Sequence, residues 1–218
     1  MKFYNLARQW LLYFLRNRNS NWTYKILKNC PTPPQKFIDL ARTGDRSFFG
    51  SEPESANYEP GKNPRLNRML VKPSKAHTEP SVRNPRYELG PEFTEWLQNN
   101  MFSNFDETVV SISHQGDGRS FGPHTDRWRC YALMYIVDPG GAGAATTFWK
   151  EKFYPAVRDG GVTINDYTDL VEIDSVVLKA GQWVILQART LHSVEHIDHI
   201  RIAFQISVND LSELERFF

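Results

Sequence analysis

Cysteines and long apolar runs are scarce in this 218-residue chain, and each scarcity excludes a class of protein. The two cysteines, Cys30 and Cys130, are too few for a small scaffold held together by disulfides. No apolar run approaches the roughly 18 residues of a membrane-spanning helix. The N-terminal stretch Trp10–Leu15 is also too short for the core of a signal peptide. We therefore expect a cytoplasmic protein with no membrane partner.

Acidic residues are missing before Asp39, although the net charge of the whole chain is +1. Residues 1–86 hold 16 basic and 6 acidic residues, whereas residues 87–218 hold 10 basic and 19 acidic residues. A basic half can bind nucleic acid, or it can pack beside an acidic half of the same chain. The basic residues are scattered and form no block of five, which favours packing and leaves nucleic acid as the less favoured partner.

The N-terminal part, residues 1–106, is predicted to form a helical and irregular layer. Apolar residues at helical spacing over residues 3–28, including Tyr24 and Leu27, predict one or two amphipathic helices. Further short helices are predicted from Pro34 to Arg42 and from Pro91 to Asn100. The segment between them is rich in proline, serine and asparagine, which is typical of a long functional loop.

From Glu107 onward, short strand-like runs alternate with glycine, proline and aspartate clusters. The runs cover residues 108–113, 130–137, 175–178, 183–186 and 202–208. Many short strands without intervening helices form a sandwich, a barrel or a jelly roll. We predict one structural domain overall, in which residues 1–106 pack on a mainly β core formed by residues 107–218.

The segment Pro123–Asp126 carries the strongest chemical signal. Residues i and i+2 of an extended chain point to the same side, so His124 and Asp126 present an imidazole and a carboxylate to one point. These are two of the three ligands in the 2-His-1-carboxylate triad of non-haem iron(II). A His-x-Asp triplet alone is common by chance, so the prediction depends on a third ligand.

His192, which closes a long apolar run, is the favoured third ligand, and His196 and His199 are its rivals. Arg201 follows His192 by nine residues and opens the last strand-like run. A hairpin connection over residues 193–200 would bring Arg201 near His192 across neighbouring antiparallel strands. A guanidinium in that place could bind a carboxylate through two hydrogen bonds.

Together these segments resemble the iron(II)- and 2-oxoglutarate-dependent dioxygenases, in particular their prolyl-hydroxylase-like branch. The resemblance covers residues 107–210, and its pieces are Gly122–Asp126, Arg129–Val137, Gly140–Phe148, Gly181–Leu186, His192 and Arg201–Phe204. It implies a double-stranded β-helix, which is a cupin-like jelly roll with flanking helices. It also implies that His124, Asp126 and His192 bind Fe2+ and that Arg201 holds the distal carboxylate of 2-oxoglutarate.

The remaining cosubstrate contacts depart from the family pattern, because His114 and Ile136 stand near positions where the family often has tyrosine. The resemblance implies that Met134 and Ile136 face the cosubstrate while Tyr131 and Tyr135 face away. A register shift of one residue would exchange the two pairs. On the last strand, Gln205 and Ser207 share the side of Arg201 and are further candidates for the pocket lining.

The resemblance implies an enzyme, a hydroxylase that converts 2-oxoglutarate and O2 into succinate and CO2 while it oxidises a C–H bond. Its substrate would be a peptidyl residue, with proline one candidate, or an amino-acid-like metabolite. Ascorbate is an admissible additional reductant, and residues 44–90 are a candidate lid. Two alternatives stay open: a non-catalytic metal-binding module of the cupin type, which needs no Arg201, and a nucleic-acid-directed oxygenase of the same superfamily.

Overall fold

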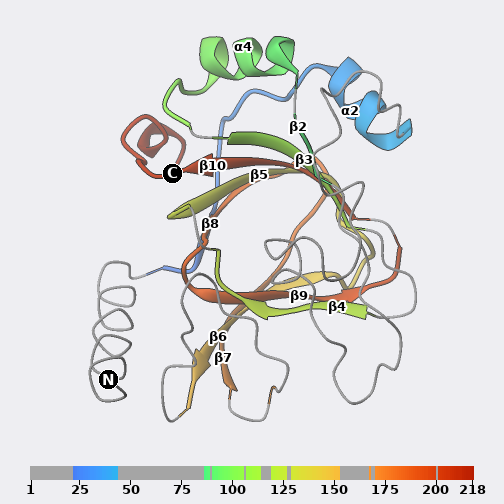
Figure 1. Ribbon diagram of the computed structural model, residues 1–218, viewed down its shortest axis with the longest axis vertical. Coiled ribbons are helices and arrows are strands. Elements are labelled where there is room, and N and C mark those ends of the chain that lie inside the picture. Colours follow the sequence, from blue (N-terminus) through green and yellow to red (C-terminus); the bar gives the residue numbers. More distant parts are fainter. Residues whose placement is uncertain are drawn as a thin grey trace, which may run out of the picture.

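Two antiparallel sheets face each other in the computed structural model (Figure 1). It describes residues 22–43, 86–88, 90–105, 107–113, 119–126, 129–152, 167, 170–199 and 201–218. The six-stranded sheet contains, in spatial order, β1 (Tyr24–Ile26), β8 (Trp183–Gln187), β5 (Tyr131–Asp138), β10 (Arg201–Val208), β3 (Glu107–Ser113) and β2 (Arg86–Glu88). The four-stranded sheet contains β4 (Arg119–His124), β9 (Leu191–Ile197), β6 (Ala145–Glu151) and β7 (Leu170–Val177).

The order in which the chain visits the two sheets defines the fold. From β3 to β10 the chain changes sheet at every step except between β6 and β7, which pair with each other. This alternation winds the strands into a double-stranded β-helix, so the predicted mainly β jelly roll is confirmed.

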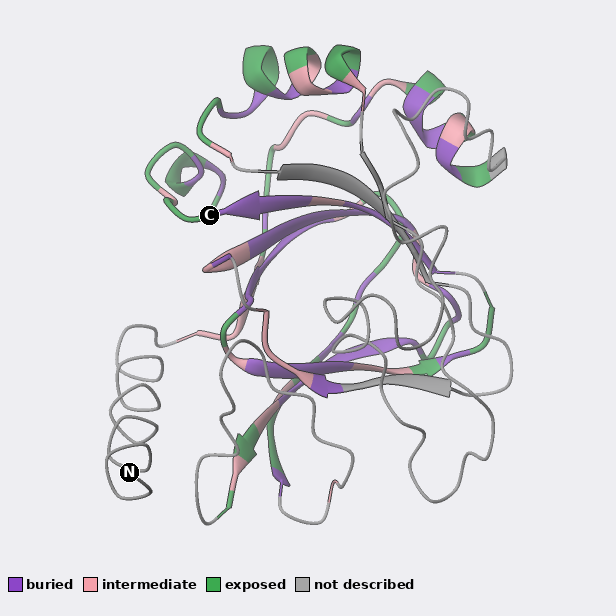
Figure 2. Cartoon of the chain, viewed as in Figure 1, coloured by how far each residue is buried: buried purple, intermediate pink, exposed green. Residues whose placement is uncertain are grey.

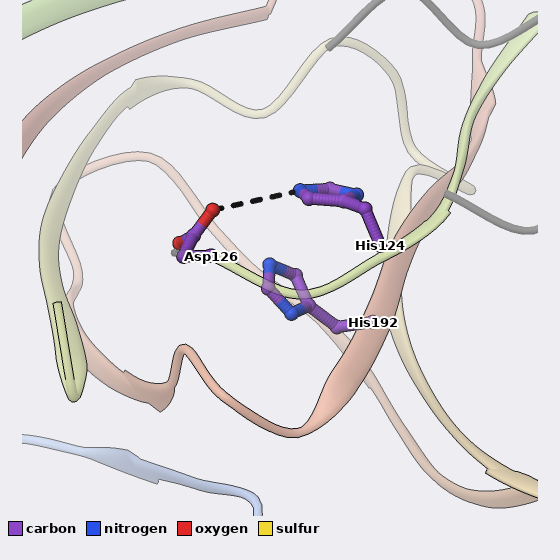
Figure 3. A group of neighbouring side chains, drawn as sticks. All are labelled: His124, Asp126 and His192. Atoms are coloured by element: carbon purple, nitrogen blue, oxygen red, sulfur yellow. Dashed lines mark ion pairs between the residues drawn. The ribbon is translucent and has the colours of Figure 1, made fainter. Parts of the chain in front are cut away.

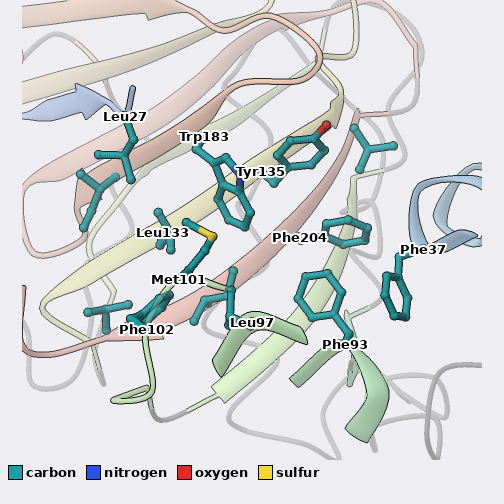
Figure 4. Packing of buried hydrophobic residues seen from close by; sticks show 14 of the residues in the cluster. Leu27, Phe37, Phe93, Leu97, Met101, Phe102, Leu133, Tyr135, Trp183 and Phe204 are labelled. Carbon is teal, nitrogen blue, oxygen red and sulfur yellow. The ribbon is translucent and has the colours of Figure 1, made fainter. Parts of the chain in front are cut away.

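Two helices, α2 (Gln35–Thr43) and α4 (Pro91–Asn100), lie on the outer face of the six-stranded sheet (Figure 1). In α4, a proline starts the first turn, and Phe93 and Leu97 are buried one turn apart. The ring of Phe93 lies 5.1 Å from that of Phe37 in α2 and 4.9 Å from that of Phe204 in β10 (Figure 4). The helices predicted at these two places are confirmed, and this contact attaches both of them to the sheet.

Strands β5, β8 and β10 of the larger sheet are buried along nearly their whole length, because each of their faces covers a different core (Figure 2). In β5, Leu133 and Tyr135 pack under the helices, whereas Met134 and Ile136 pack between the sheets with Phe148 of β6. Met134 and Ile136 therefore lie on the predicted side of β5, and their contact with a cosubstrate stays a prediction. They face the interior that the two sheets enclose.

Two local predictions were wrong. The helical spacing through Tyr24 and Leu27 does not continue a helix, because Tyr24–Ile26 forms β1 and pairs with β8 at the sheet edge. Residues 193–200 are not a hairpin connection, because most of them belong to β9 in the smaller sheet. In both places pairing with distant strands determines the structure, which local spacing cannot show. Within the described ranges, no helix is both long and apolar enough to cross a membrane.

The packing of α4 gives a stability prediction. Phe93→Ala should lower the free energy of unfolding by about 3–5 kcal/mol in urea denaturation, because it leaves a cavity between α2, α4 and β10. Gln98→Ala, on the exposed side of the same helix, should change it by less than about 0.5 kcal/mol. Similar small losses for both variants would contradict this packing.

Candidate metal centre

His124 and His192 lie directly opposite each other in the register of β4 and β9. Opposite residues of an antiparallel pair project to the same face of the sheet at close range. The two imidazole rings are accordingly 4.4 Å apart between centroids. The residues are 68 positions apart in the sequence, so the strand pairing alone brings them together.

Asp126 completes the group just beyond the end of β4. Its backbone N–H donates to the carbonyl of Ala188, at 2.8 Å, which holds the turn beside the end of β8. One carboxylate oxygen of Asp126, Oδ1, lies 3.9 Å from Nε2 of His124 (Figure 3). One ligand atom from each of Asp126, His124 and His192 lies within 4.8 Å of the other two, and these three form a group that could hold a metal ion.

The surroundings of His192 favour a neutral imidazole with a free Nε2 lone pair, which is the form that could bind a metal ion. Its Nδ1 hydrogen bonds with the carbonyl of Thr190 at 2.8 Å, and since a carbonyl only accepts, Nδ1 carries the proton and Nε2 is left to bind a metal. Burial is the main effect on its pKa, which is lowered below the ordinary value of 6.5. The neutral imidazole is the form that binds metals.

The rival histidines lie elsewhere. His199 is exposed and pairs with Asp138, with Nε2 and Oδ1 3.1 Å apart. His196 is also exposed and has a positive φ of 56°. Neither belongs to the metal-binding group found among the described residues. His114 lies outside the described residues, and so does nearly all of the candidate lid.

Arg201 reaches the interior from the opposite sheet. The prediction that it neighbours His192 across adjacent strands was wrong, because His192 lies in β9 and Arg201 in β10 of the larger sheet. Arg201 is 5% exposed, its Nη2 donates to Oγ1 of Thr146 at 3.3 Å, and its Nη1 is buried without a hydrogen-bond partner in the described part of the chain. Burial lowers the pKa of Arg201 to about 10, so the side chain remains a cation at neutral pH.

This unpaired donor fits the cosubstrate that the sequence resemblance implies. A buried cation with an unused N–H group is costly unless an anion meets it. A carboxylate can accept two parallel hydrogen bonds from a guanidinium. The interior therefore contains a group at the smaller sheet that could hold a metal ion, and a buried guanidinium on the larger sheet whose Nη1 has no acceptor in the described part of the chain.

Sequence reasoning missed Arg129, the side chain that contacts the carboxylate of the triad. Its Nε donates to Oδ2 of Asp126 at 2.7 Å, and both groups are largely buried. The spacing of three residues was the one signal in the sequence, and an Asp-x-x-Arg spacing is too frequent to be informative. Gln205 was predicted to line the pocket, and in the structure its Oε1 accepts from both Nη atoms of Arg129.

Comparisons with known proteins find likeness in structure but not in sequence. No family model and no curated protein sequence matches the chain. A prolyl hydroxylase from Trichoplax adhaerens, solved with a peptide fragment of hypoxia inducible factor, matches with 12% identity and a TM-score of 0.43, covering 98% of this chain and 95% of that one. The alpha-ketoglutarate-dependent epimerase SnoN from nogalamycin biosynthesis matches with 14% identity and a TM-score of 0.48, covering 91% and 81%.

A prolyl-4-hydroxylase from Pseudomonas putida matches with 13% identity and a TM-score of 0.41, covering 87% of this chain and 93% of that one. The class of enzyme that the sequence motifs resemble is thus represented among the matching structures. At such identities these matches assign no role to any residue of this chain.

The turn at Gly140, which packs against Arg201, gives a second stability prediction. Gly140 has a φ of +85°, and a Cβ atom there would lie 2.8 Å from Cβ of Arg201. Gly140→Ala should lower the free energy of unfolding by about 1–3 kcal/mol, since both the backbone and the contact are strained. Gly143→Ala in the same loop meets no atom within 4 Å and is the matched control, with an expected change below about 0.5 kcal/mol. Equal stabilities of both variants in urea denaturation would show that this turn does not press on Arg201.

Proposed function

We propose that this protein is an iron(II)- and 2-oxoglutarate-dependent dioxygenase that hydroxylates a C–H bond and produces succinate and CO2. One observation supports the proposal most strongly. A 2-His-1-carboxylate group at the smaller sheet faces the same interior as Arg201 of the larger sheet, whose buried Nη1 has no hydrogen-bond partner among the described residues. A bound metal ion would explain the 2-His-1-carboxylate group, and the distal carboxylate of a bound 2-oxo acid would explain the buried arginine.

In this mechanism His124, Asp126 and His192 would hold Fe2+ and leave positions open for other ligands. A bound Fe2+ would supply the activation of O2 and the oxidative decarboxylation of the 2-oxo acid. Arg201 would orient the cosubstrate by binding its distal carboxylate, an interaction that burial strengthens. Between these points, Met134, Ile136 and Phe148 provide apolar walls that exclude water.

The substrate would approach from the side of His124. The side chain of His124 is 22% exposed, compared with 7% for that of Asp126, while His192 is buried. We propose a peptidyl residue, with proline one candidate, or an amino-acid-like small molecule as the substrate. One matching structure is a complex with a peptide fragment, and the epimerase SnoN has been solved in complex with nogalamycin RO.

A non-catalytic metal-binding module of the cupin type is the second candidate. The same three ligands would serve it equally well. It gives no reason, however, for a buried arginine whose Nη1 meets no acceptor within the described ranges of the chain. The dioxygenase is therefore the better account of the whole interior.

The reaction is tested by measuring succinate from 2-oxoglutarate in the presence of Fe2+ and O2, with a library of peptides and amino acids as substrates. Wild type should release succinate, and Asp126→Ala should reduce the rate by more than about 100-fold, since loss of outer-sphere partners alone costs about 10–100-fold. His199→Ala, which removes an exposed histidine outside the group, should leave the rate unchanged. Succinate release at the wild-type rate by Asp126→Ala would contradict the assignment of Asp126 as a metal ligand.

The role of Arg201 is tested by comparing two cosubstrates. Arg201→Gln should raise the KM for 2-oxoglutarate by about 10–100-fold, since it removes a charge-assisted hydrogen bond. The same variant should use 2-oxobutyrate, which lacks the distal carboxylate, about as well as wild type does. If both KM values rise together, Arg201 supports the fold rather than the carboxylate.

A further inference from the structure

The two carboxylate oxygens of Asp126 have different neighbours, because only one of them contacts Arg129. Oδ2 accepts a hydrogen bond from Nε of Arg129 at 2.7 Å, whereas Oδ1 lies toward His124. Asp126 and Arg129 have side-chain exposures of 7% and 9%, so water competes little with this contact. A charge-assisted bond in such surroundings is among the stronger hydrogen bonds of a protein.

Ala188, which directly follows β8, hydrogen bonds with both ends of the segment that carries Asp126 and Arg129. The carbonyl of Ala188 accepts from the backbone N–H of Asp126 at 2.8 Å, and the N–H of Ala188 donates to the carbonyl of Cys130 at 3.0 Å. The N–H of Cys130 in turn donates to Oδ1 of Asn209 at 2.8 Å. Arg129 therefore reaches Asp126 from a backbone that is already held in place.

Gln205 fixes the other end of the guanidinium. Its Oε1 accepts from Nη1 and Nη2 of Arg129 at 3.4 and 3.3 Å. Gln205 stands in β10 on the side of Ala203 and Arg201, which faces the interior. The chain of contacts from Gln205 through Arg129 to Asp126 thus links the larger sheet to the metal ligand.

We propose that Arg129 is a positioning residue that keeps Asp126 monodentate, with Oδ1 on the metal and Oδ2 on the guanidinium, and that Gln205 acts through Arg129. The inference rests on the proposed function. A carboxylate that bound through both oxygens would occupy a position that the triad otherwise leaves open. The proposed reaction needs such positions for the 2-oxo acid and O2, so the contact between Arg129 and Asp126 would keep them available.

Loss of Arg129 would have two opposite effects on metal affinity. The lost orientation of Asp126 weakens binding, typically by about 10–100-fold for an outer-sphere partner. The lost positive charge near the metal strengthens it. Arg129→Met removes both the hydrogen-bond donor and the charge, Arg129→Lys keeps a cationic donor, and Arg189→Met removes an exposed charge elsewhere.

The experiment is a Co2+ titration of the metal-free full-length protein, followed by visible ligand-field absorption. Arg129→Met should bind Co2+ about tenfold more weakly and change the shape of the absorption band, because the coordination mode of Asp126 changes. Arg129→Lys should restore most of the affinity and of the band, and Arg189→Met should match wild type. Arg129→Met with wild-type affinity and band, or with tighter binding, would overturn the inference.

A double variant tests the route through Gln205. If Gln205 acts only through Arg129, Gln205→Met should weaken Co2+ binding about threefold in wild type and not at all in Arg129→Met. Additive losses would overturn that part of the inference. If Arg129→Met fails to fold, as judged by circular dichroism, Gln205→Met alone must still shift the band, and an unchanged band would overturn the proposal.

The same titration separates the inference from the proposed function. Wild type that binds Co2+ no more tightly than His124→Ala would overturn the proposed metal site, and the positioning role with it. Wild type that binds tightly while Arg129→Met behaves identically overturns the positioning role alone.

Discussion

Two histidines that oppose each other across one pair of strands are the basis of the group that could hold a metal ion in this protein. The register of β4 and β9 puts His124 and His192 side by side, and the end of β4 leaves Asp126 within reach of both. A shift of one residue in that register would turn one imidazole to the other face of the sheet. The jelly roll therefore holds the side chains of His124, Asp126 and His192 together.

The two sheets contribute different parts of the site. The smaller sheet and the turn after it supply the group that could bind a metal, and the larger sheet supplies the buried cation at Arg201. The apolar lining between them lowers the local dielectric, which strengthens a hydrogen bond to a carboxylate and penalises an unpaired charge. Helices α2 and α4 cover the outer face of the larger sheet and leave the interior to the site.

The predictions from the sequence succeeded where the signal is local. The i, i+2 spacing of His124 and Asp126 survives in the structure, and alternation along β5 placed Met134 and Ile136 inside. The predictions failed where pairing between distant strands determines the structure. Tyr24 has helical spacing to Leu27 but joins a sheet edge, and His192 and Arg201 are near in sequence yet belong to different sheets. The contact between Arg129 and Asp126 depends on side-chain positions that no spacing rule encodes.

The central claim is that one Fe2+ binds between His124, Asp126 and His192, beside a 2-oxo acid held by Arg201. Anomalous diffraction at the iron edge, from crystals prepared without oxygen in the presence of Fe2+ and 2-oxoglutarate, tests this claim most directly. The account predicts one strong peak bonded to Nε2 of both histidines and to Oδ1 of Asp126, with the distal carboxylate at Nη1 of Arg201. A peak at another place, such as the exposed pair of His199 and Asp138, would contradict it.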